Sequence, residues 1–220
     1  MTAQTKHPSE HAGGALTIQR VRPFEQGRLV LSSPAIDGDG WIDDRYSAWF
    51  DDLVPTIAWT DVLEAESYAL VVEDPDAPGD KPFVHWLVWN IPGTTKALPA
   101  LSRQARAPEL RGAVQGRNSA GQPGWHGVQP PEGHGVHRYH FQLFALSSPL
   151  DHLSDGASLE ELVDGLKGTT IAAGELVGLY ERRDPLAAAP AKEDVRGGLD
   201  EDDVDRHAPH TQDGEVLQQS

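Results

Sequence analysis

Three long apolar segments restrict the folds open to this chain more than any other feature of its sequence. They are SYALVVED (67–74), FVHWLVWNI (83–91) and HRYHFQLFAL (137–146), and turn-forming residues flank them. Their β-branched and aromatic content predicts strands, and the last of the three alternates cleanly between polar and apolar residues. The shorter segments LTIQRV (16–21) and RLVLSS (28–33) predict two more strands, separated by a turn.

Helix signals come late in the chain. Ser158 and Glu161 form a capping box at the start of SLEELVDGL, which predicts a helix there. The segment 169–183 has apolar residues at helical spacing and predicts a second helix. Because strands come first and helices last, we expect a mainly β protein, an antiparallel β-sandwich with a few peripheral helices that are mostly C-terminal.

The length of 220 residues predicts a single domain with tails. Residues 1–13 are polar without periodicity and predict a disordered N-terminal arm. The folded domain is expected over 14–185. Residues 186–220 are rich in acids, Gly and Pro and predict an acidic disordered tail, whose role the sequence does not indicate.

Charge and cysteine content exclude several classes of function. The net charge is −16, and residues 35–76 alone carry twelve acidic residues against one basic, or −11. Such an acidic chain is a poor ligand for nucleic acid or an anionic membrane. With no Cys, disulfides, thiolate metal sites and a cysteine nucleophile are excluded. The sequence also lacks a nucleotide-binding glycine motif, so no cofactor is expected.

The N-terminal residues have no apolar core of the kind found in signal peptides, and no apolar run approaches about 20 residues. We therefore expect no membrane span and a cytoplasmic location.

The two-residue period of a strand suggests where chemistry could lie. Asp74 shares a face with the apolar residues Tyr68, Leu70 and Val72. His85 should share a face with Phe83, Leu87 and Trp89, and both His137 and Tyr139 with Phe141, Leu143 and Ala145. Each strand thus places a polar group at one end of an apolar face. If 67–74 and 83–91 pair through the loop 75–82, these groups meet at one rim and form a small cavity with a polar wall.

Each of these residues also has a purely structural interpretation. Asp74 could cap the Asp-Pro turn that follows it, a strand histidine is often structural, and Tyr139 could be a core residue. Three strands that end with polar groups at one rim are harder to explain by packing alone.

Two motifs in this chain resemble the phosphatidylethanolamine-binding protein family, which is also called the Raf kinase inhibitor-like family. The first is Asp74-Pro75-Asp76-Ala77-Pro78 after an apolar strand, followed by His85-Trp86 and Asn90-Ile91-Pro92. The second runs from Gly127 through Pro130, His134 and His137 to Tyr139. The resemblance covers about residues 14–183.

The resemblance implies an antiparallel β-sandwich with a small pocket for phosphate or phosphorylated head groups. It assigns the ligand-binding wall and rim to seven residues: Asp74, Pro78, His85, Gly127, Pro130, His137 and Tyr139. It also suggests that Tyr180 could line the pocket. Among partners, it implies a small anionic ligand and, for some members, a kinase or serine protease that the protein inhibits. A homodimer is one of the oligomeric states that it allows.

Binding is favoured over catalysis because no serine lies within these motifs to serve as a nucleophile, and no known metal-ligand motif is present. A weak hydrolase that uses the Asp and His side chains is the alternative. Charge-assisted hydrogen bonds are the stronger ones, so anion affinity is expected to rise as the pH falls through the histidine range.

Overall fold

The protein folds into two antiparallel sheets with short helices at their periphery. The computed structural model describes residues 14–21, 29–102 and 110–182, so the predicted arm and acidic tail lie outside the described residues. In chain order the elements are α1 (Thr17–Val21), β1 (Leu31–Ser32), the 3-10 helix η1 (Asp44–Tyr46), β2 (Ile57–Trp59), β3 (Ser67–Asp74), β4 (Phe83–Pro92), β5 (Ala97–Leu98), β6 (Val114–Gln115), β7 (His137–Leu146), α2 (Leu159–Leu166) and β8 (Thr170–Tyr180).

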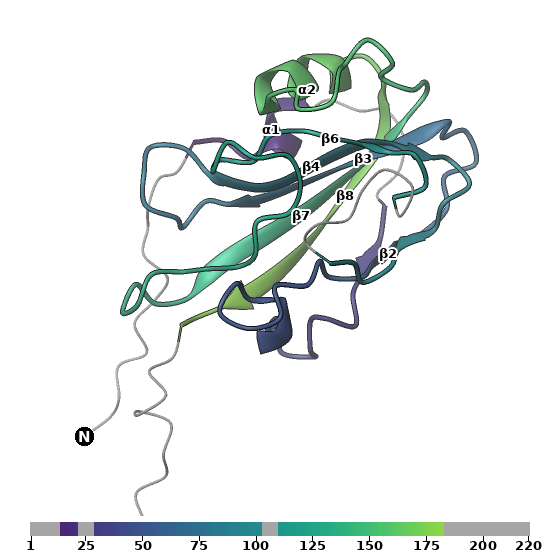
Figure 1. The fold of residues 1–220 in the computed structure, drawn as a ribbon. Helices are drawn as coiled ribbons and strands as arrows, with labels where there is room; N and C mark the ends of the chain where they lie inside the picture. Colours follow the sequence, from purple (N-terminus) through teal and green to yellow (C-terminus); the bar gives the residue numbers. More distant parts are fainter. Residues whose placement is uncertain (1–13, 22–28, 103–109, 183–220) are drawn as a thin grey trace, which may run out of the picture.

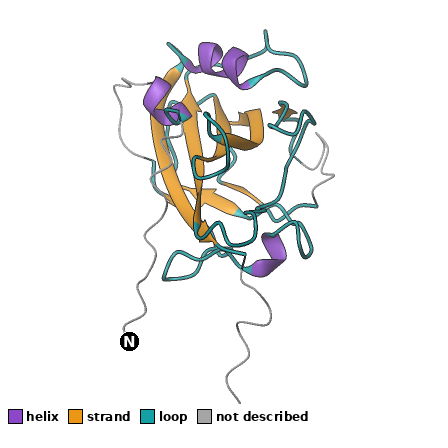
Figure 2. Ribbon diagram, turned by 90° about the vertical axis from the view of Figure 1, so that its left-hand side faces the viewer, coloured by secondary structure: helices purple, strands orange, loops and turns teal. Residues whose placement is uncertain are grey.

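The larger sheet has five strands in the order β6-β4-β3-β7-β8, and the smaller has three in the order β1-β2-β5. Helices α1 and α2 lie on one side of the larger sheet, and β2 lies on the other (Figure 1). Figure 2 shows the same arrangement from the side, with the helices outside the stacked strands. The expectation of a mainly β, antiparallel sandwich is confirmed.

Two hydrophobic cores cover the two faces of the larger sheet. The inner core lies between the sheets and includes Leu70 of β3 and Ile57 of β2. The outer core lies under the helices and includes Val71 of β3 and Leu162 of α2. Alternate residues of β3 therefore enter different cores, which is why all eight of its residues are buried.

The three long strands were correctly predicted. Strands β3 and β7 begin and end at the predicted residues, and β4 is one residue longer. The capping box is also confirmed, because the Ser158 hydroxyl accepts from the Glu161 amide and the Glu161 carboxylate accepts from the Ser158 amide. The strand expected at 28–33 is present only as β1.

The prediction of a strand at 16–21 is wrong, because this segment forms helix α1. The first N–H groups of a helix have no partner within the helix. Here the Thr17 amide donates to Glu73 Oε2 at 2.8 Å, and the Ile18 amide donates to Gln142 Oε1 at 2.7 Å. Both acceptors are buried side chains of the larger sheet, so a tertiary contact stabilises the start of the helix.

The prediction of a helix at 169–183 is also wrong, because residues 170–180 form β8, which pairs along the full length of β7. Two glycines allow other backbone segments to approach β8 closely. A Cβ at Gly174 would lie 2.1 Å from the Leu29 carbonyl oxygen, and one at Gly178 would lie 2.6 Å from Ile42 Cγ1.

None of the described helices is both long and apolar enough to cross a membrane.

Candidate functional site

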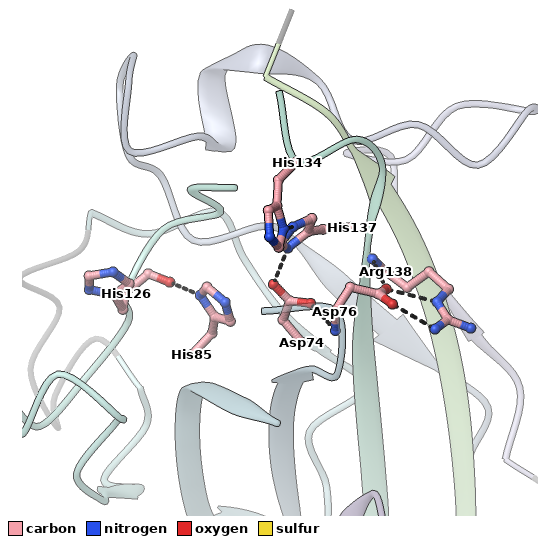
Figure 3. Close-up of polar contacts among 7 residues, drawn as sticks. All are labelled: Asp74, Asp76, His85, His126, His134, His137 and Arg138. Atoms are coloured by element: carbon pink, nitrogen blue, oxygen red, sulfur yellow. Dashed lines mark hydrogen bonds and ion pairs between the residues drawn. The ribbon is translucent and has the colours of Figure 1, made fainter. Parts of the chain in front are cut away.

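The first pair of site residues comes from two neighbouring antiparallel strands. Asp74 is the last residue of β3 and His137 is the first of β7. Because these strands pair antiparallel, the two residues lie at the same end of the sheet. His137 Nδ1 lies 2.7 Å from Asp74 Oδ2, and both side chains are buried (Figure 3). The carboxylate thus holds the imidazole in one orientation.

An ion pair between the buried Asp76 and the half-exposed Arg138 joins the loop after β3 to β7. The Asp76 amide donates to Asp74 Oδ1 at 2.8 Å. The Asp76 carboxylate in turn accepts from the Arg138 amide at 2.9 Å and from its guanidinium at 2.8 and 2.7 Å. Burial raises the pKa of Asp76, but the hydrogen bonds from Arg138 outweigh burial and lower this pKa below its usual value. Because both oxygens of Asp74 have donors, its role is to hold other groups in place.

His85 reaches the site because β4 contains a β-bulge. Val72 of β3 pairs with Trp86 and the next residue, Glu73, pairs with Val84, so His85 is the extra residue. Its ring lies 5.1 Å from that of Tyr139 and 4.8 Å from that of Phe83.

The bulge corrects one detail of the alternation. Leu87 and Trp89 were predicted to share the face of His85, but both belong to the outer core. A strict two-residue period fails there because the inserted residue reverses the phase of the residues that follow it, as far as Trp89.

The imidazole of His85 is held as a neutral ring with a defined tautomer. Its Nδ1 lies 2.6 Å from the carbonyl oxygen of His126, and a carbonyl can only accept, so Nδ1 carries the proton. Burial lowers the pKa of His85 to about 4, although the hydrogen bond to His126 and the charge of Asp74 offset part of the effect. Nε2 therefore presents a lone pair, and no described residue donates to it.

This state of His85 changes the expected pH dependence. Protonation of this ring cannot strengthen anion binding in the ordinary histidine range, since its pKa lies well below that range.

Tyr139 is the fourth residue of the site. It lies two positions after His137 in β7 and belongs to the inner core. Its side chain is fully buried, and its hydroxyl makes no hydrogen bond of normal geometry with a described residue, although the backbone of Gln129 lies close enough to act on it. Burial, followed by the charge of Asp74, raises the pKa of Tyr139 well above its usual value. The phenol therefore keeps its proton at physiological pH and can donate it to a bound group.

Two histidines that the sequence reasoning did not assign to the site contact it directly. His134 Nδ1 lies 2.9 Å from His137 Nε2, and His126 supplies the carbonyl that orients His85. Both lie within or beside the second motif, and Figure 3 shows His134 beside His137 and His126 beside His85. Their spacing carried no strand or helix signal, since both lie in irregular segments.

The remaining predicted residues lie in the surrounding loops. Gly127 is buried, and a Cβ there would lie 2.1 Å from Asp52 Oδ1, so only glycine lets the loop that holds Asp52 approach. Pro130 is buried and Pro78 is exposed, and their contribution to a ligand site stays a prediction.

Tyr180 reaches the same face from β8, where it pairs with His137, and its hydroxyl donates to Asp44. Within the described part of the chain, no three His, Asp or Glu side chains are grouped so that they could hold a metal ion.

Comparison with known proteins assigns this chain to a protein family. A family model described as phosphatidylethanolamine-binding protein matches residues 32–181. A UPF0098 protein of Pyrococcus horikoshii is 45% identical over 160 residues, which cover 72% of this chain and 80% of that protein. A UPF0098 protein of Aquifex aeolicus is 37% identical over 172 residues, which cover 78% of this chain and 92% of that protein.

Two solved structures share the fold. The crystal structure of Escherichia coli YbcL, described as a new member of the mammalian PEBP family, matches with a TM-score of 0.66 and 29% identity over 71% of this chain and all of that one. That of a putative phosphatidylethanolamine-binding protein homologue from Chlamydia trachomatis matches with a TM-score of 0.63 and 32% identity, over 72% of this chain and 100% of that one.

Proposed function

The chain belongs to the phosphatidylethanolamine-binding protein family, and from this premise we propose that it binds phosphate or a phosphorylated head group at the site described above. Membership of the family supports a ligand-binding or regulatory role in general. The finer assignment to a small anion rests on the side chains of Asp74, His85, His137 and Tyr139.

One observation carries the proposal. Nearly all buried polar groups in folded proteins have a hydrogen-bond partner. The Tyr139 hydroxyl has none of normal geometry among the described residues, and its ring contacts that of His85, whose Nδ1 is occupied by the His126 carbonyl and whose Nε2 is left to accept. A buried hydroxyl without a partner, next to an imidazole with a free lone pair, supports a ligand that pairs with both.

Asp74 and His137 have partners within the protein, so they would contribute to ligand binding less directly. His137 is oriented by Asp74, and its outward nitrogen is paired with His134. A ligand oxygen that reached this nitrogen would replace the contact with His134. Asp74 itself would not touch an anion, since both its oxygens are already occupied by donors.

We propose binding without turnover. A tyrosine with a raised pKa is a poor nucleophile, and the other groups of the site are imidazoles and a carboxylate that orients one of them. A protein partner such as a kinase or protease, a homodimer and a cytoplasmic location stay predictions.

Calorimetric titration of the full chain with inorganic phosphate tests the proposal. Tyr139→Phe removes one hydrogen bond to a charged group and should weaken binding by about tenfold or more. His152→Ala changes an exposed histidine after β7 and should bind as the parent does. If Tyr139→Phe and His137→Ala both bind phosphate like the parent, the site assignment fails.

A further inference from the structure

We propose that this site selects an oxyanion that keeps one proton, such as the monoanion of a phosphate monoester, over an equally charged oxyanion that has none. The inference rests on the proposed function and concerns the same site. It follows from the two atoms that the site leaves unpaired, because one can donate a hydrogen bond and the other can only accept one.

The accepting atom is His85 Nε2, and its role is determined by the backbone. The carbonyl of His126 occupies Nδ1, and no other placement of the proton satisfies that contact at 2.6 Å. The ring lies in the bulge of β4 against Phe83, Trp125 and Tyr139, so a rotation that would exchange the two nitrogens would break these contacts. A ligand atom that approaches Nε2 must therefore bring a hydrogen with it.

The donating atom is the Tyr139 hydroxyl. Burial keeps the phenol protonated, so it can donate to an ionised ligand oxygen. A protonated phosphate monoester matches both neighbours at once: its P–OH donates to His85 Nε2, and one of its charged oxygens accepts from Tyr139. In this arrangement no covalent bond is broken and no proton is transferred between the ligand and the protein.

The surrounding charges favour the less charged ligand. The titratable groups around the His85 and Tyr139 side chains come from several elements: Asp74, Asp76, His126, His134, His137 and Tyr180. The charge of Asp74 acts on both His85 and Tyr139. A carboxylate this close repels a dianion more than a monoanion, so it favours the protonated ligand over the fully ionised one.

Comparing methyl phosphate with methyl sulfate tests the effect of the ligand's proton separately from the effect of its charge. Near pH 5.5 both are predominantly monoanions of similar shape, but only methyl phosphate has a hydrogen to donate. We expect calorimetry of the full chain at this pH to give an affinity for methyl phosphate at least about tenfold above that for methyl sulfate, because a sulfate oxygen would face the lone pair of His85 Nε2 with a lone pair of its own.

The pH profile supplies a second arm. The affinity for methyl phosphate should be level below about pH 5 and fall about a hundredfold by pH 8, as the ligand loses its second proton. Methylphosphonate, whose second proton is held more tightly, should show the same fall at higher pH. A titrating protein group would instead give the same midpoint for both ligands, and that result overturns the inference.

His85→Gln tests the accepting atom, since an amide can turn its N–H toward the ligand and donate to a sulfate oxygen. The preference for methyl phosphate should then fall toward unity, whereas the matched control His152→Gln should keep it. If this variant does not fold, the two ligand series on the parent protein still decide the question.

The outcomes distinguish the two claims. Equal binding of methyl sulfate and methyl phosphate overturns this inference and leaves the anion site standing. If neither ligand nor inorganic phosphate binds, the proposed function fails and the inference fails with it.

Discussion

Removing the Tyr139 hydroxyl should make the ligand-free protein more stable, which is opposite to the usual effect of truncating a buried tyrosine. The ring is fully buried in the inner core, and Phe would keep all of its packing. What Tyr139→Phe removes is a buried hydroxyl that has no hydrogen bond of normal geometry with a described residue.

The expected size follows from the cost of such a group. An unpaired buried hydroxyl costs about 1–3 kcal/mol, and the nearby backbone of Gln129 recovers part of that cost. We therefore expect the free energy of unfolding to rise by about 1 kcal/mol, which corresponds to an increase in Tm of about 2–4 °C for a chain of this size.

Tyr180→Phe is the matched control, because the Tyr180 hydroxyl donates to Asp44 Oδ1 at 3.1 Å. Its loss should lower the free energy of unfolding by about 0.5–1.5 kcal/mol, the usual net value of a hydrogen bond. Urea unfolding of the parent and both variants, followed by tryptophan fluorescence, gives the three free energies under one set of conditions.

Saturating phosphate should reverse the order of parent and Tyr139→Phe. A ligand at a hundred times its Kd stabilises the folded state by about 2.7 kcal/mol, and the variant would receive less of this because it binds more weakly. A loss of about 1 kcal/mol or more in ligand-free Tyr139→Phe would show that the hydroxyl is paired inside the folded protein, and the argument for a ligand at this position would collapse.

Three further predictions concern the residues that hold the site in place and the bounds of the folded domain. A double-mutant cycle of Asp74→Ala and His137→Ala in urea unfolding should give a coupling of about 1.5–3 kcal/mol, and additive effects would show that the 2.7 Å contact does not persist in solution. Because the pKa of Asp76 is lowered in the folded state, its contribution is present above the unfolded value near about 3.9 and is lost as the pH falls through the folded value. Asp76→Asn should therefore flatten the decline of stability with acid, and an unchanged acid profile would contradict this. A chain of residues 14–185 should melt within a few degrees of the full chain, since the inner and outer cores lie within residues 16–180. A drop of about ten degrees would show that the removed segments contribute to the fold.

The sequence predicted the strands that carry the site, and it did so for a physical reason. Strands β3 and β7 lie in the centre of the larger sheet and are buried on one or both faces, so their apolar content had to be high. Alternation within these strands correctly placed Asp74, His137 and Tyr139 on the inner face. The same alternation assigned His85 to this rim as well, but it wrongly grouped His85 with Leu87 and Trp89, which belong to the outer core.

Sequence reasoning failed where a distant contact chose between two local structures. Residues 170–180 suit both a helical and a strand period, and pairing with β7 together with the close approach of Leu29 to Gly174 selects the strand. Residues 16–21 are rich in β-branched residues, yet Glu73 and Gln142 supply acceptors for the first turn of α1. Neither contact can be read from the segment itself.

The sequence by itself determined that three strands end in polar groups, which residues those groups are, and that the fold is an antiparallel sandwich. Only the tertiary structure decided what the groups can do. The bulge of β4 brings His85 to Tyr139, the His126 carbonyl assigns the proton to Nδ1, and burial keeps the ring neutral. Hydrogen-bond direction depends on which atoms meet across the fold, so residue identities can name the members of a site without fixing which of them donate and which accept.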